Sequence, residues 1–134
     1  MDSETLYSKL KEYLLKTPDL MRHLHTNACW EYKIYETFLD EPEPKLNYFL
    51  SKKDNRTLQI IQNNSQIIPD LILFFTEKSI LSLIHDNPKA EIYYERYRKM
   101  MQNPAPDGVD SKINKSRFNL LRLGYQKWQK DFRF

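Results

Sequence analysis

The first apolar positions of the chain recur at helical spacing, on one face of a segment from about Glu4 to Lys16. They are Leu6, Leu10, Tyr13 and Leu14. This spacing predicts an amphipathic helix. Thr17 then stands before Pro18, and a capping residue followed by proline predicts a second, short helix that runs to about His25.

From Cys29 onward apolar and polar residues alternate, which is typical of half-buried strands. The apolar positions are Trp30, Tyr32, Ile34 and Phe38 in a first strand, Leu46, Tyr48 and Leu50 in a second, and Leu58 and Ile60 in a third. Turn-forming residues separate these strands at 40–44 and 54–56, and a further turn is predicted at 63–65. Three sequential strands joined by short turns predict an antiparallel meander.

A fourth strand is predicted from about Leu71 to Phe75. Its residues are apolar on both faces, so we expect it at the centre of a sheet or beneath packed helices. Thr76 follows as the predicted cap of a helix that reaches about Asp86.

The pattern then predicts a longer helix from Pro88 to about Gln102, ended by the prolines at 104 and 106. Its apolar face consists of Ala90, Tyr93, Tyr94, Tyr97, Met100 and Met101. Residues 109–114 predict a short strand, and a final helix begins near Ser116. The apolar stripe of that helix is Phe118, Leu121, Tyr125, Trp128 and Phe132.

The predicted order of elements is therefore α-α-β-β-β-β-α-α-β-α. It indicates an α+β fold in which a five-stranded, largely antiparallel, curved sheet carries helices layered on one face. A chain of 134 residues has the usual length of one domain, so we expect residues 1–134 to form a single domain.

Composition excludes several classes of site. Two glycines are too few for a phosphate-binding loop or a dinucleotide fingerprint. The single Cys29 excludes an intrachain disulfide and a thiolate zinc cluster. No apolar run approaches the roughly 20 residues that a membrane span requires. Residues 1–4 lack a signal-peptide pattern, so we expect a cytoplasmic protein.

Four segments give the chain a resemblance to a known family. They are Trp30–Ile34, Asp70–Thr76, Ile80–Ile84 and Val109–Asn114. In their residues and order they resemble the sterol carrier protein type-2 family of lipid-binding domains, in its small prokaryotic form. The resemblance implies a hydrophobic tunnel between the sheet and the C-terminal helices, which holds a fatty-acyl or sterol-like ligand without a cofactor.

The tyrosine and methionine face of the helix from Pro88 to Gln102 is the main candidate for such a site. Tyrosine offers an apolar wall with a polar tip, and methionine adapts to flexible chains. The predicted ligand-binding residues are Leu73, Phe75, Leu81, Ile84, Tyr94, Tyr97, Met101, Ile113, Leu121 and Tyr125. Helical spacing is equally expected of a packed core. A filled cavity would make the domain a non-enzymatic protein-interaction module that uses its aromatic and basic C-terminal helix.

Basic residues gather near the C-terminus, where seven stand against three aspartates and give a local net charge of +4, while the whole chain carries +3. The seven are Lys112, Lys115, Arg117, Arg122, Lys127, Lys130 and Arg133. Such a segment attracts an anionic membrane surface, although a solvated basic face has the same pattern. No nucleic-acid-binding motif accompanies the charge, so we expect no nucleic-acid partner. Nothing in the pattern sets an oligomeric state.

No group of residues predicts catalysis or metal binding. His23 and His25 would point about 200° apart on a helix and so would not share a metal. Cys29 begins a strand, where a buried, inert thiol is expected. The acidic residues at 40–43 lie among prolines and predict a solvated turn, and His85 at a helix end has a structural interpretation. We therefore expect a non-catalytic binding protein.

Overall fold

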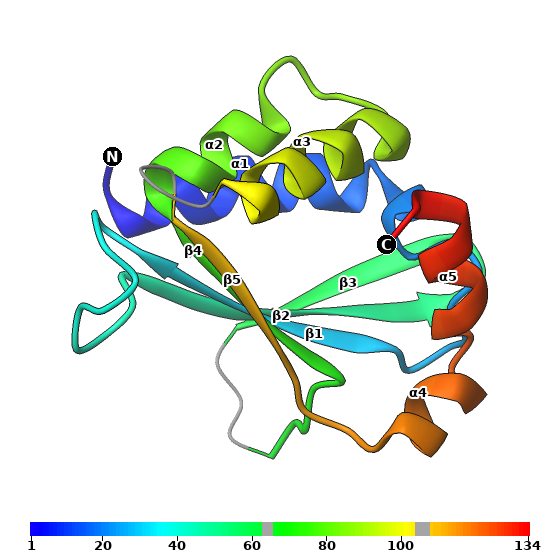
Figure 1. Cartoon of the computed structure of the whole chain (residues 1–134). Coiled ribbons are helices and arrows are strands. Elements are labelled where there is room, and N and C mark those ends of the chain that lie inside the picture. The colour runs from blue at the N-terminus through cyan, green and yellow to red at the C-terminus, as the bar shows by residue number, and fades with distance from the viewer. Residues whose placement is uncertain (63–65, 104–107) are drawn as a thin grey trace.

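The computed structural model describes residues 1–62, 66–103 and 108–134. These residues contain an open five-stranded sheet in the order β3-β2-β1-β4-β5 (Figure 1). The strands are β1 (Cys29–Tyr35), β2 (Leu46–Asp54), β3 (Thr57–Gln62), β4 (Leu71–Thr76) and β5 (Val109–Ile113). The turn predicted at 63–65 and the prolines predicted to end a helix at 104 and 106 lie outside the described residues.

The pairing of the strands confirms the predicted meander, because β2 lies antiparallel between β1 and β3. On its other side β1 pairs with β4, and these two strands run parallel, with Trp30 opposite Leu71 and Ile34 opposite Phe75. β5 returns antiparallel to β4 and forms one edge of the sheet. The sheet is therefore mixed but mostly antiparallel, and the predicted α+β class is confirmed.

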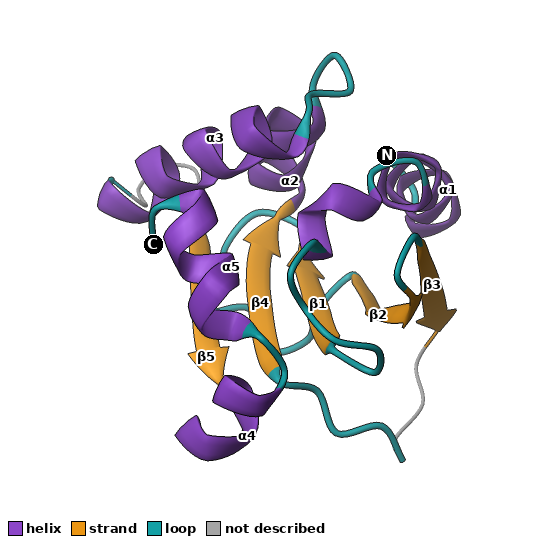
Figure 2. Ribbon diagram, turned by 90° about the vertical axis from the view of Figure 1, so that its right-hand side faces the viewer, coloured by secondary structure: helices purple, strands orange, loops and turns teal. Residues whose placement is uncertain are grey.

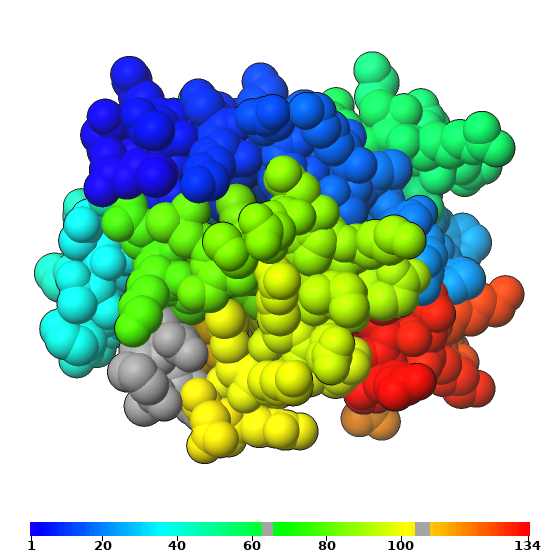
Figure 3. All heavy atoms as spheres, turned by 90° about the horizontal axis from the view of Figure 1, so that it is seen from above, coloured from blue at the N-terminus to red at the C-terminus, as the bar shows by residue number. Residues whose placement is uncertain are grey.

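The helices cover one face of this sheet, as predicted (Figures 1 and 2). They are α1 (Ser3–Leu15), the 3-10 helix η1 (Pro18–Met21), α2 (Glu77–Ile84), α3 (Ala90–Gln102) and α5 (Tyr125–Phe132), whereas the short α4 (Arg117–Arg122) lies below the sheet. Ring contacts identify the covered face: Tyr7 of α1 meets Tyr48, Tyr97 of α3 meets Phe75, and Trp128 of α5 meets Trp30. From above, α1, α2 and α3 form a continuous layer, and α5 lies beside α3 (Figure 3).

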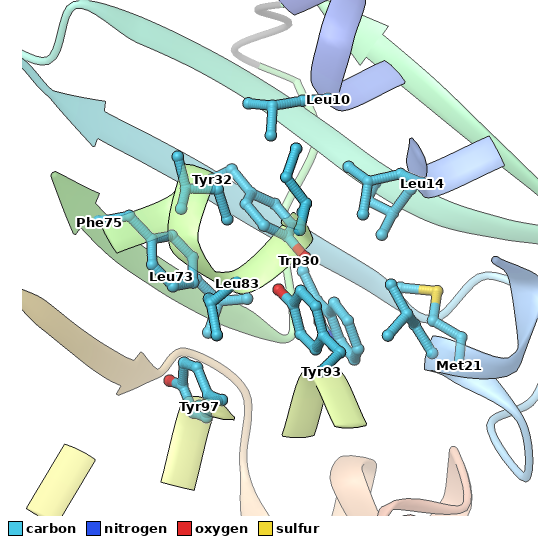
Figure 4. Packing of buried hydrophobic residues seen from close by; sticks show 14 of the residues in the cluster. Leu10, Leu14, Met21, Trp30, Tyr32, Leu73, Phe75, Leu83, Tyr93 and Tyr97 are labelled. Carbon is cyan, nitrogen blue, oxygen red and sulfur yellow. The ribbon is translucent and has the colours of Figure 1, made fainter. Parts of the chain in front are cut away.

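Aromatic side chains form the centre of the core. Trp30, Tyr32 and Ile34 alternate along β1 toward the helices, and each is at most 1% exposed. The ring of Tyr32 stacks between those of Tyr48 and Phe75, at centroid distances of 4.9 and 5.7 Å. Figure 4 shows Trp30, Tyr32 and Phe75 of this group together with side chains from the covering helices. Such rings bury large apolar areas and gain further from their mutual geometry, so they position the covering helices firmly.

Two elements end earlier than the sequence predicts. The second helix is a single 3-10 turn that stops at Met21, because the chain turns at His23 and Asn27, which have φ values of 73° and 78°. The first strand ends at Tyr35 instead of reaching Phe38, whose side chain is 64% exposed. There the Glu41 carboxylate accepts hydrogen bonds from the backbone of two residues and holds a turn.

The predicted C-terminal helix is divided into α4 and α5 at Gly124. Gly124 has a φ of +91°, a conformation that favours glycine, and it lies against the backbone of His23. A Cβ atom at this position would stand only 2.2 Å from the carbonyl oxygen of His23. This close approach breaks the helix and sets the direction in which α5 crosses the sheet.

Replacing Gly124 with alanine is expected to lower the free energy of unfolding by about 2 kcal/mol or more, since the added methyl meets backbone and the positive φ strains any L-residue. Chemical denaturation of the pure protein measures this loss. Gln126→Ala, an exposed substitution in the same helix, is the matched control and should change stability by less than about 0.5 kcal/mol. Equal stability of the two variants would contradict this account of the break.

A buried lysine ties the segment after η1 to the sheet. Lys52 of β2 is 6% exposed, and its ammonium donates to the carbonyl oxygens of Met21 and Leu24 at 3.2 and 2.7 Å. Burial lowers the pKa of this ammonium below its ordinary value. Lys52 thereby holds the turn from Met21 to Leu24 against β2.

Candidate functional site

A cavity of about 410 Å³ lies between the covered face of the sheet and helices α3 and α5. Strands β1, β4 and β5 supply its floor, and the two helices supply its roof. Its apolar and aromatic lining consists of Trp30, Tyr32, Leu71, Leu73, Tyr93, Tyr94, Tyr97, Met101, Ile113, Leu120, Tyr125, Trp128 and Phe134. The polar lining consists of Arg98, Gln102, Ser111, Gln129 and Arg133. Apolar side chains thus dominate, and no carboxylate side chain is among these lining residues.

Hydrogen bonds hold four aromatic side chains of the inner wall in place: Trp30, Tyr94, Tyr125 and Trp128. The Trp30 indole donates to the Tyr125 hydroxyl at 2.8 Å. The Tyr94 hydroxyl and the Trp128 indole both donate to the carbonyl oxygen of Leu20, at 2.6 and 3.1 Å. The rings of Trp30 and Trp128 lie 5.6 Å apart. A wall held in this way presents apolar ring surface to the cavity.

The mouth of the cavity opens between α3, α5 and the edge strand β5. Three of its apolar residues are partly exposed: Met101 by 39%, Phe134 by 45% and Ile113 by 66%. Ser111 also faces the cavity from β5 and is exposed. The Arg98 guanidinium donates to the carbonyl oxygen of Phe132, which joins α3 to the end of α5. A ligand could therefore enter over β5 without disturbing the inner wall.

A buried carboxylate supports this wall from behind. Asp70 is fully buried, and its Oδ2 atom accepts hydrogen bonds from the Tyr125 hydroxyl and the Cys29 amide, each at 2.8 Å. The Lys115 ammonium lies 2.6 Å from Oδ1. Burial and the charge of Asp70 raise the pKa of the Tyr125 phenol. Asp70 therefore joins β1, β4 and α5 at one point and fixes Tyr125 as a neutral donor.

Cys29 is not prepared for nucleophilic chemistry. Its side chain is buried, and burial together with the nearby Asp70 charge raises the pKa of the thiol to about 12. A nucleophilic cysteine requires the thiolate, which these surroundings disfavour at neutral pH.

Of the predicted ligand-binding residues, six line the cavity: Leu73, Tyr94, Tyr97, Met101, Ile113 and Tyr125. The other four do not. Phe75 packs between the rings of Tyr32 and Tyr97, and Ile84 is buried on α2. Leu81 is half-buried on α2, away from the cavity. Leu121 is 56% exposed, because the break at Gly124 separates α4 from the helix that roofs the cavity.

Several lining residues were not predicted from the sequence. Trp30 and Tyr32 alternate with Ile34 on β1, so the period of two places them on the covered face. Trp128 shares a helical stripe with Tyr125, since residues three positions apart lie on the same side of a helix. These patterns predict burial, but they do not indicate which buried side chains border empty space. No periodic pattern of this kind predicted the burial of Arg98, Gln129 or Phe134.

The other side chains considered for chemistry serve structural contacts. His23 lies 3.1 Å from Asp131, and His85 forms an exposed pair with Asp86 at 3.3 Å. Within the described residues, no three histidine, cysteine, aspartate or glutamate side chains gather in a way that could hold a metal. Over the same residues, none of the helices has the length and apolar character needed to cross a bilayer.

Comparison with known proteins places the fold. A solved structure described as "UbiJ-SCP2 Ubiquinone synthesis protein" superposes on this chain with a TM-score of 0.52. The chain has the SCP2-like fold. The match covers 98% of this chain and 90% of the other, at 8% sequence identity, so it shows the fold alone. No family model and no curated protein sequence matches the chain.

Proposed function

We propose that this protein binds an apolar ligand, a fatty-acyl or sterol-like lipid, in the cavity between the sheet and helices α3 and α5, without catalysis. The observation that carries the proposal is the aromatic-lined cavity of about 410 Å³ with its mouth at the edge strand. Its volume falls within the roughly 300–1,000 Å³ of small-molecule sites. Its lining, apolar with a few polar groups at the mouth, has the composition of such sites.

The driving force for binding is the removal of apolar surface from water, at about 25 cal/mol for each Å² before the entropic costs of association. An inner wall held by hydrogen bonds reduces those costs, since Trp30, Tyr94 and Trp128 are already ordered. The polar lining at the mouth suits the head of an amphiphile, which stays near water while its chain lies against the rings. The SCP2 domain of the superposed ubiquinone synthesis protein supports the lipid class of ligand.

Transient contact with an anionic membrane surface belongs to the same proposal, because a lipid carrier must meet the source of its ligand. The alternative is a non-enzymatic protein-interaction module of the same fold with a filled cavity, which uses its aromatic and basic C-terminal segment. The exposed Phe118 and Leu121 on α4 favour such a partner surface, whereas the cavity of about 410 Å³ does not.

Solvent extraction of the natively purified protein distinguishes the lipid carrier from the protein-interaction module. We expect lipid in stoichiometric amount by mass spectrometry, and saturable binding of the fluorescent fatty acid cis-parinaric acid by the delipidated protein. Lipid-free extracts together with no saturable binding would reject the carrier and favour the interaction module.

Met101→Arg is expected to weaken binding of cis-parinaric acid by at least about tenfold, because it places a charge on the apolar lining at the mouth. Met101 is 39% exposed, so the guanidinium can reach water in the free protein and folding is preserved. Ile92→Arg is the matched control: Ile92 lies on the same helix, is 42% exposed and does not line the cavity. Equal affinity of the two variants, with unchanged circular dichroism, would place the ligand elsewhere.

A further inference from the structure

Helix α4 is the one α-helix of the described chain without a buried residue. Both ribbon views show it projecting below the sheet at the foot of α5 (Figures 1 and 2). Two large apolar side chains on it face solvent, Phe118 at 67% and Leu121 at 56% exposure. They stand three positions apart, which places them on one side of the helix. Leu120, between them in sequence, is half-buried and lines the cavity instead.

The segment around these residues carries only one sign of charge. From Ser111 to Lys130 the sequence contains six basic residues and no acidic one. They are Lys112, Lys115, Arg117, Arg122, Lys127 and Lys130. The flanking Asp131 is neutralised by Arg22 at 2.5 Å. Exposed apolar side chains surrounded by cations have the composition of an interfacial membrane anchor, in which the apolar groups enter the headgroup boundary and the cations meet anionic lipids.

A second cavity lies beside α4 and has a different character. Its volume is about 370 Å³, and it is lined by His25, Lys115, Asn119, Arg122 and Leu123. Four of these side chains carry N–H donors or a cation, and no carboxylate side chain lines the space. Charged nitrogen donors suit phosphate oxygens. The Arg122 guanidinium also lies 5.8 Å from the ring of Phe118, so the cationic and apolar parts of the surface adjoin.

From this geometry we propose that α4 docks the protein on an anionic phospholipid surface, with Phe118 and Leu121 inserted among the lipids. Asn119 and Arg122 then face a lipid phosphate in the second cavity, beside the Lys115 ammonium, which Asp70 holds at 2.6 Å. The purpose of this docking rests on the proposed function, which is the binding of a lipid. Leu120 and Ile113 line the ligand cavity and connect its mouth with the docked surface. A chain leaving the bilayer there would reach the aromatic wall without crossing open water.

Co-sedimentation with vesicles tests the surface. The wild-type protein should bind vesicles of phosphatidylcholine with phosphatidylserine, should not bind phosphatidylcholine alone, and should lose binding as salt is raised. The double variant Phe118→Ser/Leu121→Ser should bind at least about tenfold more weakly, equivalent to roughly 1.4 kcal/mol. Its matched control is Phe38→Ser/Ile68→Ser, which removes two side chains that are 64% and 69% exposed elsewhere.

A second pair of variants tests the charge. Arg117→Gln/Arg122→Gln should weaken binding to the anionic vesicles by about tenfold, whereas Lys53→Gln/Arg56→Gln, exposed at the β2–β3 turn, should have little effect. Wild-type affinity in the Phe118/Leu121 variant, or equal binding to neutral vesicles, would overturn the proposal. Loss of a wild-type dimer in that variant, without a change in vesicle binding, would assign α4 to self-association.

Binding of cis-parinaric acid without vesicles keeps the two proposals apart. The Phe118→Ser/Leu121→Ser variant should bind this probe with wild-type affinity, because neither side chain lines the cavity. Vesicle binding without probe binding would reject the ligand cavity and leave the docking surface. Probe binding without vesicle binding would reject the docking surface and leave the ligand cavity.

Discussion

Replacing Asp70 with alanine is expected to lower the free energy of unfolding by about 3–5 kcal/mol, the range for breaking a buried ion pair. The carboxylate is fully buried and has three partners: the Cys29 amide on β1, the Tyr125 hydroxyl on α5 and the Lys115 ammonium between β5 and α4. Alanine leaves the amide and the hydroxyl without an acceptor inside the protein. It also releases Tyr125 on the cavity wall, so affinity for cis-parinaric acid should fall as well.

Urea denaturation followed by circular dichroism measures this loss. Asp70→Asn should cost less, about 1–3 kcal/mol, because an amide oxygen can still accept while the charge that balances Lys115 is gone. Asp110→Ala is the matched control, since Asp110 is exposed on the neighbouring strand and should tolerate the change within about 0.5 kcal/mol. A loss below about 1 kcal/mol for Asp70→Ala would show that the cluster does not anchor the wall.

The second large effect is steep alkaline unfolding. Burial is the main cause that raises the pKa of seven tyrosines above the ordinary 10.0, and the pKa of Tyr13 and Tyr97 rises to about 12. The others are Tyr32, Tyr48, Tyr93, Tyr94 and Tyr125. A tyrosine whose pKa is higher in the folded than in the unfolded protein contributes its full stability at a pH below the unfolded pKa. This stability is lost as the pH rises from 10 toward the folded value.

Each such tyrosine lowers the free energy of unfolding by up to about 1.4 kcal/mol for each pH unit within that window. Cys29 acts in the same direction from pH 9.0 upward, since its thiol pKa is raised to about 12. Lys52 acts in the opposite direction, because its lowered pKa means that deprotonation of the folded state stabilises it up to about pH 10.5. One lysine against seven tyrosines leaves the net effect strongly destabilising above pH 10.

Tyrosinate absorbance and circular dichroism, recorded together against pH, provide the measurement. We expect the buried tyrosines to titrate in one cooperative step that coincides with unfolding. Tyr97→Phe, which removes one titrating group at the mouth of the cavity, should make the fall in stability less steep by about 1.4 kcal/mol for each pH unit. Gradual titration near pH 10 with the fold intact would contradict the burial of these hydroxyls.

Periodicity was sufficient to predict most of the fold. The alternation of Trp30, Tyr32 and Ile34 identified β1 and its covered face, and the spacing of Tyr93, Tyr94 and Tyr97 identified the buried face of α3. Such patterns are visible in a sequence because the local geometry of helices and strands sets the spacing of buried residues. The parallel pairing of β1 with β4 was not predicted, since strand order depends on contacts between distant segments.

The site was less predictable for a related physical reason. A period distinguishes buried from exposed positions, but a side chain that borders a cavity and one that fills the core have the same period. Tyr97 and Phe75 were both predicted to bind ligand, and only Tyr97 lines the cavity. Leu121 was placed with Tyr125 on one helix, which the contact between Gly124 and the His23 backbone divides. That contact joins segments far apart in the chain and leaves no local pattern.

The hydrogen bond between Trp30 and Tyr125 joins residues 95 positions apart, and it has a consequence for biosynthesis. Contacts so distant in sequence form late in folding, and the early strands of a nascent chain emerge from the ribosome before α5 has been translated. A chain stalled before Tyr125 would leave Trp30 of β1 without its contacts to Tyr125 and Trp128 of α5. Under the proposed function, loading with ligand therefore follows translation of α5.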